Sequence, residues 1–538
     1  MSQQDTTSFY RRIAGNTAYL FLGQAVGSLG LFVSYVIASR LLTRGEDTSA
    51  YDAYVLAINV GVFFLSLSEL GLTEGTTRLV ASLLAHGRRA CVPTVTQRAL
   101  AILLAASAAA TAVVLLGAER LARLVGSPET APLIALSALW IIPLAVIRVP
   151  TSVFEGFQEM KYSFLAAIVR EPLKVALFLA FAAVGFTVRL AVAGWVLWSV
   201  LALGLTLAIF ARFLHKQGLR LAEGEPLERP GLLASSRYLY LPYLSVCLLP
   251  VLLRLLVNRF SPTGGVGAFH NALSLATLTM MGFLPIAQAL LPAFAHAHAR
   301  RESPETLART AMRMVGLMAF AGLAFYSFTA GPLLSLFYGE TYRGAGLYLA
   351  MAAVGLFFDA FKTVTNPLLK GAMQARASTW IEVVRLVVTI GAGVPLTLRF
   401  GPLGMMEGFV LGCVVSTVLQ FVCVRRLLAI RCGAVAGLPT LWAAVLCAGW
   451  IAGHYFPDPG PQVTVPAALG IVAVLMIVRP PITLAELRAI WRIVARRPTP
   501  PTSSPIRAHP LYGTCGEVSR RTRRRASIAD RFRGRLTG

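Results

Sequence analysis

The chain has 538 residues, of which 56% are hydrophobic and 14% are charged, and its mean hydropathy is +0.68. A soluble domain cannot cover so much apolar surface, so the composition excludes a soluble enzyme and predicts an integral membrane protein. The net charge of +25 comes from 49 Lys and Arg against 24 Asp and Glu. The seven cysteines and seven histidines show no metal-ligand spacing, so neither a metal site nor a cofactor is expected.

About fourteen stretches of the chain are apolar and long enough to cross a bilayer. Because lipid gives backbone groups no hydrogen-bond partner, each stretch is predicted to be a helix, and the chain an all-α polytopic membrane protein. In chain order the predicted spans are 16–40, 51–71, 99–117, 131–147, 162–185, 190–211, 238–257, 266–289, 313–337, 345–366, 379–398, 402–424, 436–453 and 462–478.

The distribution of Lys and Arg predicts the orientation of these spans. With the N-terminus in the cytoplasm, most Lys and Arg fall on the cytoplasmic side, as the positive-inside rule requires. We therefore expect a multi-pass protein of the cell (inner or plasma) membrane with both termini in the cytoplasm. The loops on the outer side are short, so no outer domain is expected.

Residues 479–538 are expected to lie at the inner membrane surface. The stretch 482–497 has the pattern of an amphipathic helix, with Arg488, Arg492 and Arg496 on one face. The Pro-, Ser- and Arg-rich remainder is predicted to be disordered and attracted to anionic lipid. Because lipid accounts for its charge, nucleic acid is not an expected partner.

Two segments of the chain match each other at a constant spacing. Residues 156–170 align with residues 371–385, which pairs Arg170 with Arg385, and Gly194 answers Gly408 at nearly the same offset. The offset contains six predicted spans, an even number, so the two copies have the same orientation. The pattern predicts a parallel repeat of two six-helix lobes, and transporters built from such repeats bind substrate between them.

The repeat divides the chain into six parts. They are a cytoplasmic N-terminus at 1–15, an N-lobe at 16–211, a cytoplasmic linker at 212–237, a C-lobe at 238–424, two appended helices at 425–478 and the cytoplasmic tail at 479–538.

Eleven ionisable residues fall within or at the edges of predicted spans. Each would cost about 2.5–3.5 kcal/mol or more if it faced lipid at mid-depth, so most must face a wet cavity or one another. Six are cations (Arg40, Arg170, Lys174, Arg254, Lys362, Arg385) and five are acids (Glu69, Glu171, Asp359, Glu382, Glu407). Spacing of three residues predicts ion pairs along one helix face for Glu171–Lys174, Asp359–Lys362 and Glu382–Arg385.

Arg170 is predicted to lie about 12 Å into its span, near mid-depth, and its repeat mate Arg385 lies similarly. Both lobes could therefore aim a guanidinium, which binds phosphate through two hydrogen bonds, at one central cavity. The competing interpretation is that these charges form structural ion pairs. For Arg40, Arg254, Glu69 and Glu407, near span ends, a structural role or snorkelling is favoured.

Four segments resemble the Wzx-type flippases, which export lipid-linked oligosaccharides in polysaccharide biosynthesis and share a superfamily with the MATE drug exporters and the lipid II flippases. These segments are 15–42, 68–81, 154–166 and 333–350, the last with Gly339, Glu340 and Tyr342 in the expected places. The likeness covers roughly residues 10–430. The segment after residue 42 is longer than usual, and the signature of lipid II flippases is absent from 71–78, which disfavours a peptidoglycan precursor as substrate.

The resemblance implies a MATE-like two-lobe fold and alternating access, with a polyprenyl-diphosphate oligosaccharide carried from the inner to the outer leaflet. It also implies drive by a proton or sodium gradient or by the membrane potential, with membrane lipid and polysaccharide-assembly enzymes as partners. Under this hypothesis one set of residues binds the anionic head (Arg170, Lys174, Arg385, Lys362, Arg254). A second set couples the ion (Glu171, Glu382, Asp359).

Two other functions fit parts of the sequence. A cation-coupled multidrug exporter would share the fold, but its cavity should favour acidic and aromatic residues over cations. A membrane glycosyltransferase or polymerase is suggested by the acidic pair Glu46 and Asp47, but such enzymes carry large outer loops or a soluble domain that the sequence lacks. A membrane scaffold that transports nothing is the remaining alternative.

Overall fold

The computed structural model describes residues 3–430, apart from 226–231, 262–264, 373 and four short stretches (284–285, 288–289, 291–293 and 295–302). Every regular element within these residues is a helix, which confirms the predicted all-α class. The spans predicted at 436–453 and 462–478, the amphipathic helix at 482–497 and the basic tail lie outside the described residues.

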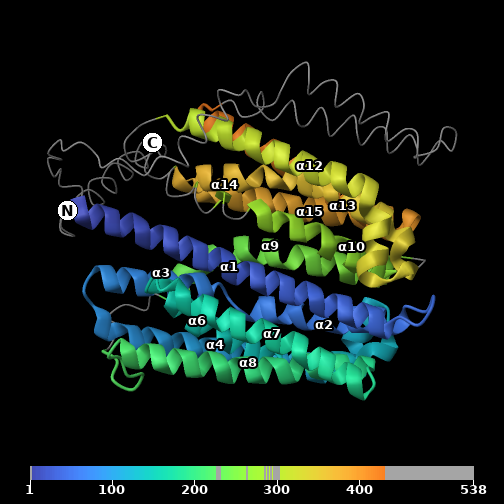
Figure 1. Cartoon of the computed structure of the whole chain (residues 1–538), viewed down its shortest axis with the longest axis horizontal. Coiled ribbons are helices and arrows are strands. Elements are labelled where there is room, and N and C mark those ends of the chain that lie inside the picture. The colour runs from blue at the N-terminus through green and yellow to red at the C-terminus, as the bar shows by residue number, and fades with distance from the viewer. Residues whose placement is uncertain are drawn as a thin grey trace, which may run out of the picture. The chain divides into compact units, whose positions relative to one another are not determined.

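The first half of the chain forms eight α-helices joined by short connections (Figure 1). They are α1 (Gln3–Leu42), α2 (Ser49–Ser68), α3 (Leu72–Ala85), α4 (Val92–Val125), α5 (Ala131–Ala138), α6 (Ile141–Gly156), α7 (Met160–Val184) and α8 (Val188–Lys216). Two short 3-10 helices, η1 (Arg89–Cys91) and η2 (Pro128–Thr130), precede α4 and α5.

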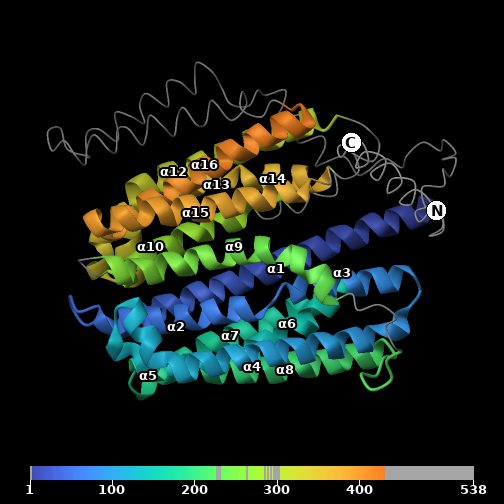
Figure 2. The same cartoon turned by 180° about the vertical axis from the view of Figure 1, so that it is seen from behind.

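The described residues of the second half are also helical (Figure 2). Its elements are α9 (Leu232–Phe260), α10 (Val266–Leu278), η3 (Thr279–Phe283), α12 (Glu305–Tyr338), η4 (Glu340–Ala345), α13 (Gly346–Ala360), α14 (Lys362–Gly371), α15 (Ala375–Phe400) and α16 (Pro402–Leu428).

Nine segments of the described residues can cross a membrane by length and composition, if the pair α5–α6, bent by 40°, counts as one span. Two further predicted spans, 162–185 and 238–257, coincide with α7 and α9, and the first part of the span predicted at 266–289 forms α10. α7 has the length of a span, at 25 residues, but carries Arg170, Glu171 and Lys174 in its middle. The protein is therefore a polytopic helical membrane protein, as predicted.

The two aligned segments have the same local structure in both halves. Gly156 is the last residue of α6 and Gly371 the last of α14, while Arg170 and Arg385 lie in the following helices, α7 and α15. The second pair of matching glycines also has one role. A Cβ on Gly194 would lie 3.2 Å from Phe181 of α7, and a Cβ on Gly408 would lie 2.4 Å from Gly393 of α15. Both glycines let a helix pack closely on the helix before it.

α1 packs on both halves of the chain. A Cβ on Gly30 would come within 2.8 Å of the Cβ of Glu171 on α7. Two residues along, the ring of Phe32 packs edge-on against Phe337 of α12, with centroids 5.2 Å apart. Figures 1 and 2 show α1 running between α2–α8 and α10–α16 accordingly. α9 belongs to the second half by sequence but packs against α2 and α3 as well as α15.

Candidate substrate-binding cavity

A cavity of about 700 Å³ lies between the two halves of the chain. The first half lines it with residues of α1, α2, α6, α7 and α8, and the second half with residues of α9, α10 and η3. Its volume falls within the range of small-molecule binding sites. The lining is mixed: aromatic rings, amides and hydroxyls alternate with charged side chains.

The charges that line the cavity are predominantly positive. Its lining includes Arg148, Arg170, Lys174 and Arg254, against the single carboxylate of Glu171. Arg148 is paired with Glu69 outside the lining, and the other three cations exceed the single acid by two charges, which favours an anionic occupant.

Glu171 binds two of these cations. Its Oε1 lies 3.0 Å from Nε of Arg170 and its Oε2 lies 2.7 Å from Nζ of Lys174. The Lys174 ammonium, whose side chain is 2% exposed, also lies over the rings of Trp195 and Trp198, 5.1 and 4.4 Å from their centroids. Three charges thus form one buried cluster that retains a net positive charge.

Arg254 of α9 has no carboxylate partner among the described residues. Its guanidinium donates to the Pro250 carbonyl at 3.1 Å and makes long contacts with Ser274 Oγ (3.4 Å) and Asn59 Oδ1 (3.5 Å). Its buried Nε has no hydrogen-bond partner. The charge of this guanidinium is therefore available to a ligand in the cavity.

The structure brings together some of the predicted site residues and separates others. Arg170, Glu171, Lys174 and Arg254 line the cavity, whereas Arg385, Lys362, Asp359 and Glu382 are not among its lining residues. The repeat had led us to expect that Arg170 and Arg385 face the same cavity. This expectation is wrong for the cavity described here, because Arg385 does not line it. The second half instead contributes Arg254, which the hypothesis from the resemblance had placed among the residues that bind the anionic head, although its position near a span end had favoured a structural role.

Arg385 lies in a closed cluster of four charges within the second half. Lys362 Nζ lies 2.6 Å from Asp359 Oδ1 and 2.8 Å from Glu382 Oε1, and Arg385 Nη1 lies 3.2 and 3.4 Å from the same two acids. Two cations and two carboxylates balance, and all four side chains are at most 17% exposed. Arg385 pairs with two acids, whereas Arg170 shares one acid with Lys174, so the charge of Arg385 is balanced inside its own half.

All three ion pairs predicted from spacing form. The Glu171–Lys174, Asp359–Lys362 and Glu382–Arg385 pairs have N–O distances of 2.7, 2.6 and 3.4 Å. Two of the residues near span ends also have structural partners. Glu69 pairs with Arg148 at 3.0 Å, and Arg40 donates to the Phe337 carbonyl at 2.7 Å, at the end of α12.

Sequence reasoning missed several lining residues. Arg148 was assigned to a loop because the predicted span ended at residue 147, yet it is part of α6 and lines the cavity. Trp195 and Trp198 could have been found, because a spacing of three residues places both indoles on the face of α8 that meets Lys174.

A polytopic helical bundle with a charged cavity between two similar halves has the architecture of a membrane transporter. Comparison with known structures identifies the fold. The chain matches a structure described as the inward-facing conformation of a multidrug resistance MATE family transporter of the MOP superfamily, with a TM-score of 0.65 and 19% identity over 75% of this chain and 94% of that one. The outward-facing conformation gives a TM-score of 0.59 at 19% identity, over 78% and 95% of the two chains. The fold is MATE-like.

The sequence identifies the family within this class. The model of the polysaccharide biosynthesis protein family matches residues 13–298, more than half of the chain, and the MatE model matches residues 239–394. The chain belongs to the polysaccharide biosynthesis protein family. No curated protein sequence matches it.

Proposed function

We propose that the chain is a flippase that translocates a polyprenyl-diphosphate-linked oligosaccharide from the inner to the outer leaflet by alternating access, for cell-surface polysaccharide biosynthesis. The observation that carries this proposal is the cationic cavity between the halves, which Arg170 lines from α7 and Arg254 from α9. A diphosphate has acceptor oxygens for both guanidinium groups and negative charge for the excess of cations. Membership of a polysaccharide biosynthesis family supports a glycan-bearing cargo.

The contacts at one end of the bundle support an inward-facing state. Where α1 ends and α2 begins, Arg40 bonds to α12, Asp52 accepts a hydrogen bond of 2.7 Å from Gly267 N on α10, and Tyr51 donates to Asn271 Oδ1 at 2.5 Å. In the predicted orientation this end faces outwards, so the cavity would open towards the cytoplasm.

In this mechanism the diphosphate accepts hydrogen bonds from Arg254 and joins Glu171 as an acceptor for Arg170. Binding neutralises cations of both halves at once, which draws the halves together around the head group and permits the contacts between Asp52 and Gly267 to break. The glycan would travel in the hydrated cavity while the prenyl chain stays in lipid. The halves would rock as the two six-helix lobes of a fourteen-span protein whose termini are both cytoplasmic.

The coupling ion is assigned to the acids inside the bundle. Asp359 and Glu382 share Lys362 and Arg385 between them, so a proton or a sodium ion could compete with these cations for the carboxylates. Glu171 is the corresponding acid in the cavity, where it would exchange Arg170 or Lys174 for the ion as the substrate leaves.

A cation-coupled multidrug exporter is the second candidate. It is favoured by the MatE match at residues 239–394 and by the aromatic residues Trp140, Trp195 and Trp198 in the cavity lining. It is disfavoured by the excess of positive charge, because a lipophilic cation would meet Arg148, Arg170 and Arg254 there. Polysaccharide-assembly enzymes are the expected partners of the flippase and not of a drug exporter.

Reconstitution in liposomes tests the proposal. We expect the purified chain to transfer a labelled polyprenyl-diphosphate glycan between leaflets. Because a hydrogen bond to a charged group contributes about 1.5–3 kcal/mol, we expect Arg254→Ala and Arg170→Ala each to slow transfer at least roughly tenfold. Arg259→Ala, an exposed arginine in the last turn of α9, is the matched control. Efflux of a lipophilic cationic dye without glycan transfer would favour the drug exporter, and unchanged transfer in both variants would remove the site assignment.

A further inference from the structure

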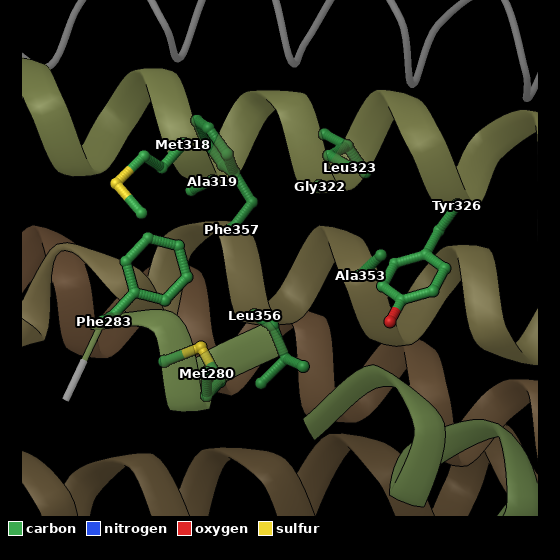
Figure 3. Close-up of a pocket in the computed structure, with 10 residues that line it drawn as sticks. All are labelled: Met280, Phe283, Met318, Ala319, Gly322, Leu323, Tyr326, Ala353, Leu356 and Phe357. Atoms are coloured by element: carbon green, nitrogen blue, oxygen red, sulfur yellow. The ribbon is translucent and has the colours of Figure 1, made fainter. Parts of the chain in front are cut away.

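A second, smaller pocket of about 150 Å³ lies between η3, α12 and α13 (Figure 3). Its lining is apolar: among the residues that line it, Tyr326 alone has a side-chain polar group, and that hydroxyl donates to the Leu275 carbonyl at 3.1 Å. The side chains that form its walls include Met280, Phe283, Met318, Leu323, Leu356 and Phe357.

η3 separates this pocket from the cationic cavity. α10 ends at Leu278 after 13 residues, and η3 (Thr279–Phe283) continues the chain as a short 3-10 helix. Met281 of η3 lines the cationic cavity, whereas Met280 and Phe283 of the same element line the apolar pocket. One helical turn thus has a polar, cationic space on one side and an apolar space on the other.

The chemistry of the pocket fits a hydrocarbon and not water. A buried water needs two to four polar partners, and an apolar cavity of about 150 Å³ stays dry and accepts a guest of roughly the size of benzene. Two of the walls carry methionines, Met280 and Met318, whose unbranched thioethers adapt to guests of different shape. A short section of a prenyl chain has the required size and polarity.

The pocket also reaches the surface of the bundle. Met318 is 43% exposed on α12, and Figure 3 shows its side chain near Phe283, at the end of the pocket away from Tyr326. In a membrane-spanning helix this surface meets acyl chains. A chain that passes η3 and this pocket can therefore continue directly into the bilayer.

We propose that the pocket between η3, α12 and α13 binds the part of the substrate's prenyl chain nearest the diphosphate, while the diphosphate lies in the cationic cavity. This inference rests on the proposed function, because it requires an anionic head in the cavity. In this arrangement the lipid passes η3, with its diphosphate on one side of that element and its prenyl chain on the other.

Binding measurements on the purified full chain test this with two ligands that differ only in the hydrocarbon. Inorganic diphosphate can occupy only the cavity, whereas geranyl diphosphate adds a ten-carbon prenyl chain. We expect the prenyl ligand to bind at least about tenfold more tightly, because each buried methylene adds to affinity. Gly322→Leu, which fills the pocket from α12, should abolish most of that difference and leave the affinity for inorganic diphosphate unchanged.

Ala321→Leu is the matched control. Ala321 precedes Gly322 on α12, is exposed and does not line the pocket. It should retain the full difference between the two ligands. If neither ligand binds the native chain, the proposed function fails. If both bind with equal affinity, the cavity assignment survives and the pocket assignment is overturned.

A photoreactive prenyl diphosphate tests the site on the unaltered chain. We expect its label on the peptides that contain Met280, Phe283 or Met318, with protection by geranyl diphosphate. Label confined to other helices, or to residues 431–478, would overturn the proposal. So would equal labelling of the same peptides by a photoreactive zwitterionic phospholipid, because the pocket would then be a general lipid contact.

Discussion

The carboxylate of Asp52, at the start of α2, accepts a hydrogen bond of 2.7 Å from the backbone N–H of Gly267, at the start of α10. An acid of one half of the chain therefore caps the N-terminus of a helix in the other half. Arg40 does the converse at the end of α12, where it donates to backbone carbonyls. Both contacts place a charge at the helix end of opposite polarity, so they hold the same end of the bundle closed.

Removing the charge of Asp52 should loosen this closure. Asp52→Asn retains the size of the side chain but loses a charge–helix interaction that contributes up to about 2 kcal/mol. We expect a cysteine placed at Thr43, which contacts Tyr342 across the same interface at 2.8 Å, to react several-fold faster with an impermeant maleimide in this background. Asp47→Asn should leave the rate unchanged, because the Asp47 carboxylate accepts a hydrogen bond from Ser49 N–H within its own loop. Equal rates in both variants would show that Asp52 does not hold the closed end.

Glu171→Gln should make stability depend on a bound anion. The substitution leaves Lys174 and Arg170 without their shared carboxylate, and an uncompensated buried charge costs about 3–5 kcal/mol. We expect a lower melting temperature, and a larger recovery on addition of inorganic diphosphate than the native chain shows. A variant that melts lower but gains no more from diphosphate than the native chain would mean that the anion binds away from this cluster.

The four-charge cluster of the second half should show strong coupling. Lys362→Met leaves Asp359 and Glu382 with Arg385 alone, and Glu382→Leu leaves Lys362 and Arg385 with one acid. Each single change should destabilise the protein by about 3–5 kcal/mol, and the double change by clearly less than the sum. The measurement is a double-mutant cycle on urea unfolding in mild detergent. Additive losses would contradict a shared network.

Gly30 should tolerate no side chain. Its added Cβ would lie 2.8 Å from the Cβ of Glu171, which forces α1 away from α7 and costs about 1–3 kcal/mol. We expect Gly30→Ala to lower both the melting temperature and glycan transfer. Gly204→Ala, on α8, is the control, because its Cβ meets nothing within 4 Å, Gly204 does not line the cavity and alanine favours the helix. The argument fails if the two variants behave alike.

Local regularities of the sequence predicted a large part of this fold. Hydropathy and span length identified the class, and the described parts of the twelve spans predicted between residues 16 and 424 are mostly helical. The ion pairs Glu171–Lys174 and Asp359–Lys362 were predictable because three residues of a helix bring two side chains to one face, whatever the helix packs against. The repeat was visible because aligned residues such as Gly156 and Gly371 end corresponding helices.

The cavity could not be predicted in the same way. A sequence shows how deep a charge lies in its span, but not how the helix is rotated or which neighbour it meets. Arg385 and Arg170 occupy aligned positions, yet Arg385 meets two acids within its own half, and Arg254, close to a span end, is the second-half cation in the cavity.

Composition, hydropathy and spacing along single helices thus determined that the chain is a helical membrane protein with paired buried charges. Only the packing of helices far apart in the sequence decided which of those charges neutralise one another. The physical reason is that the electrostatic energy of a charge in a low-dielectric bundle depends mainly on its nearest opposite charge. For Arg148, Arg254 and Arg385, the tertiary structure decides whether another helix supplies that opposite charge.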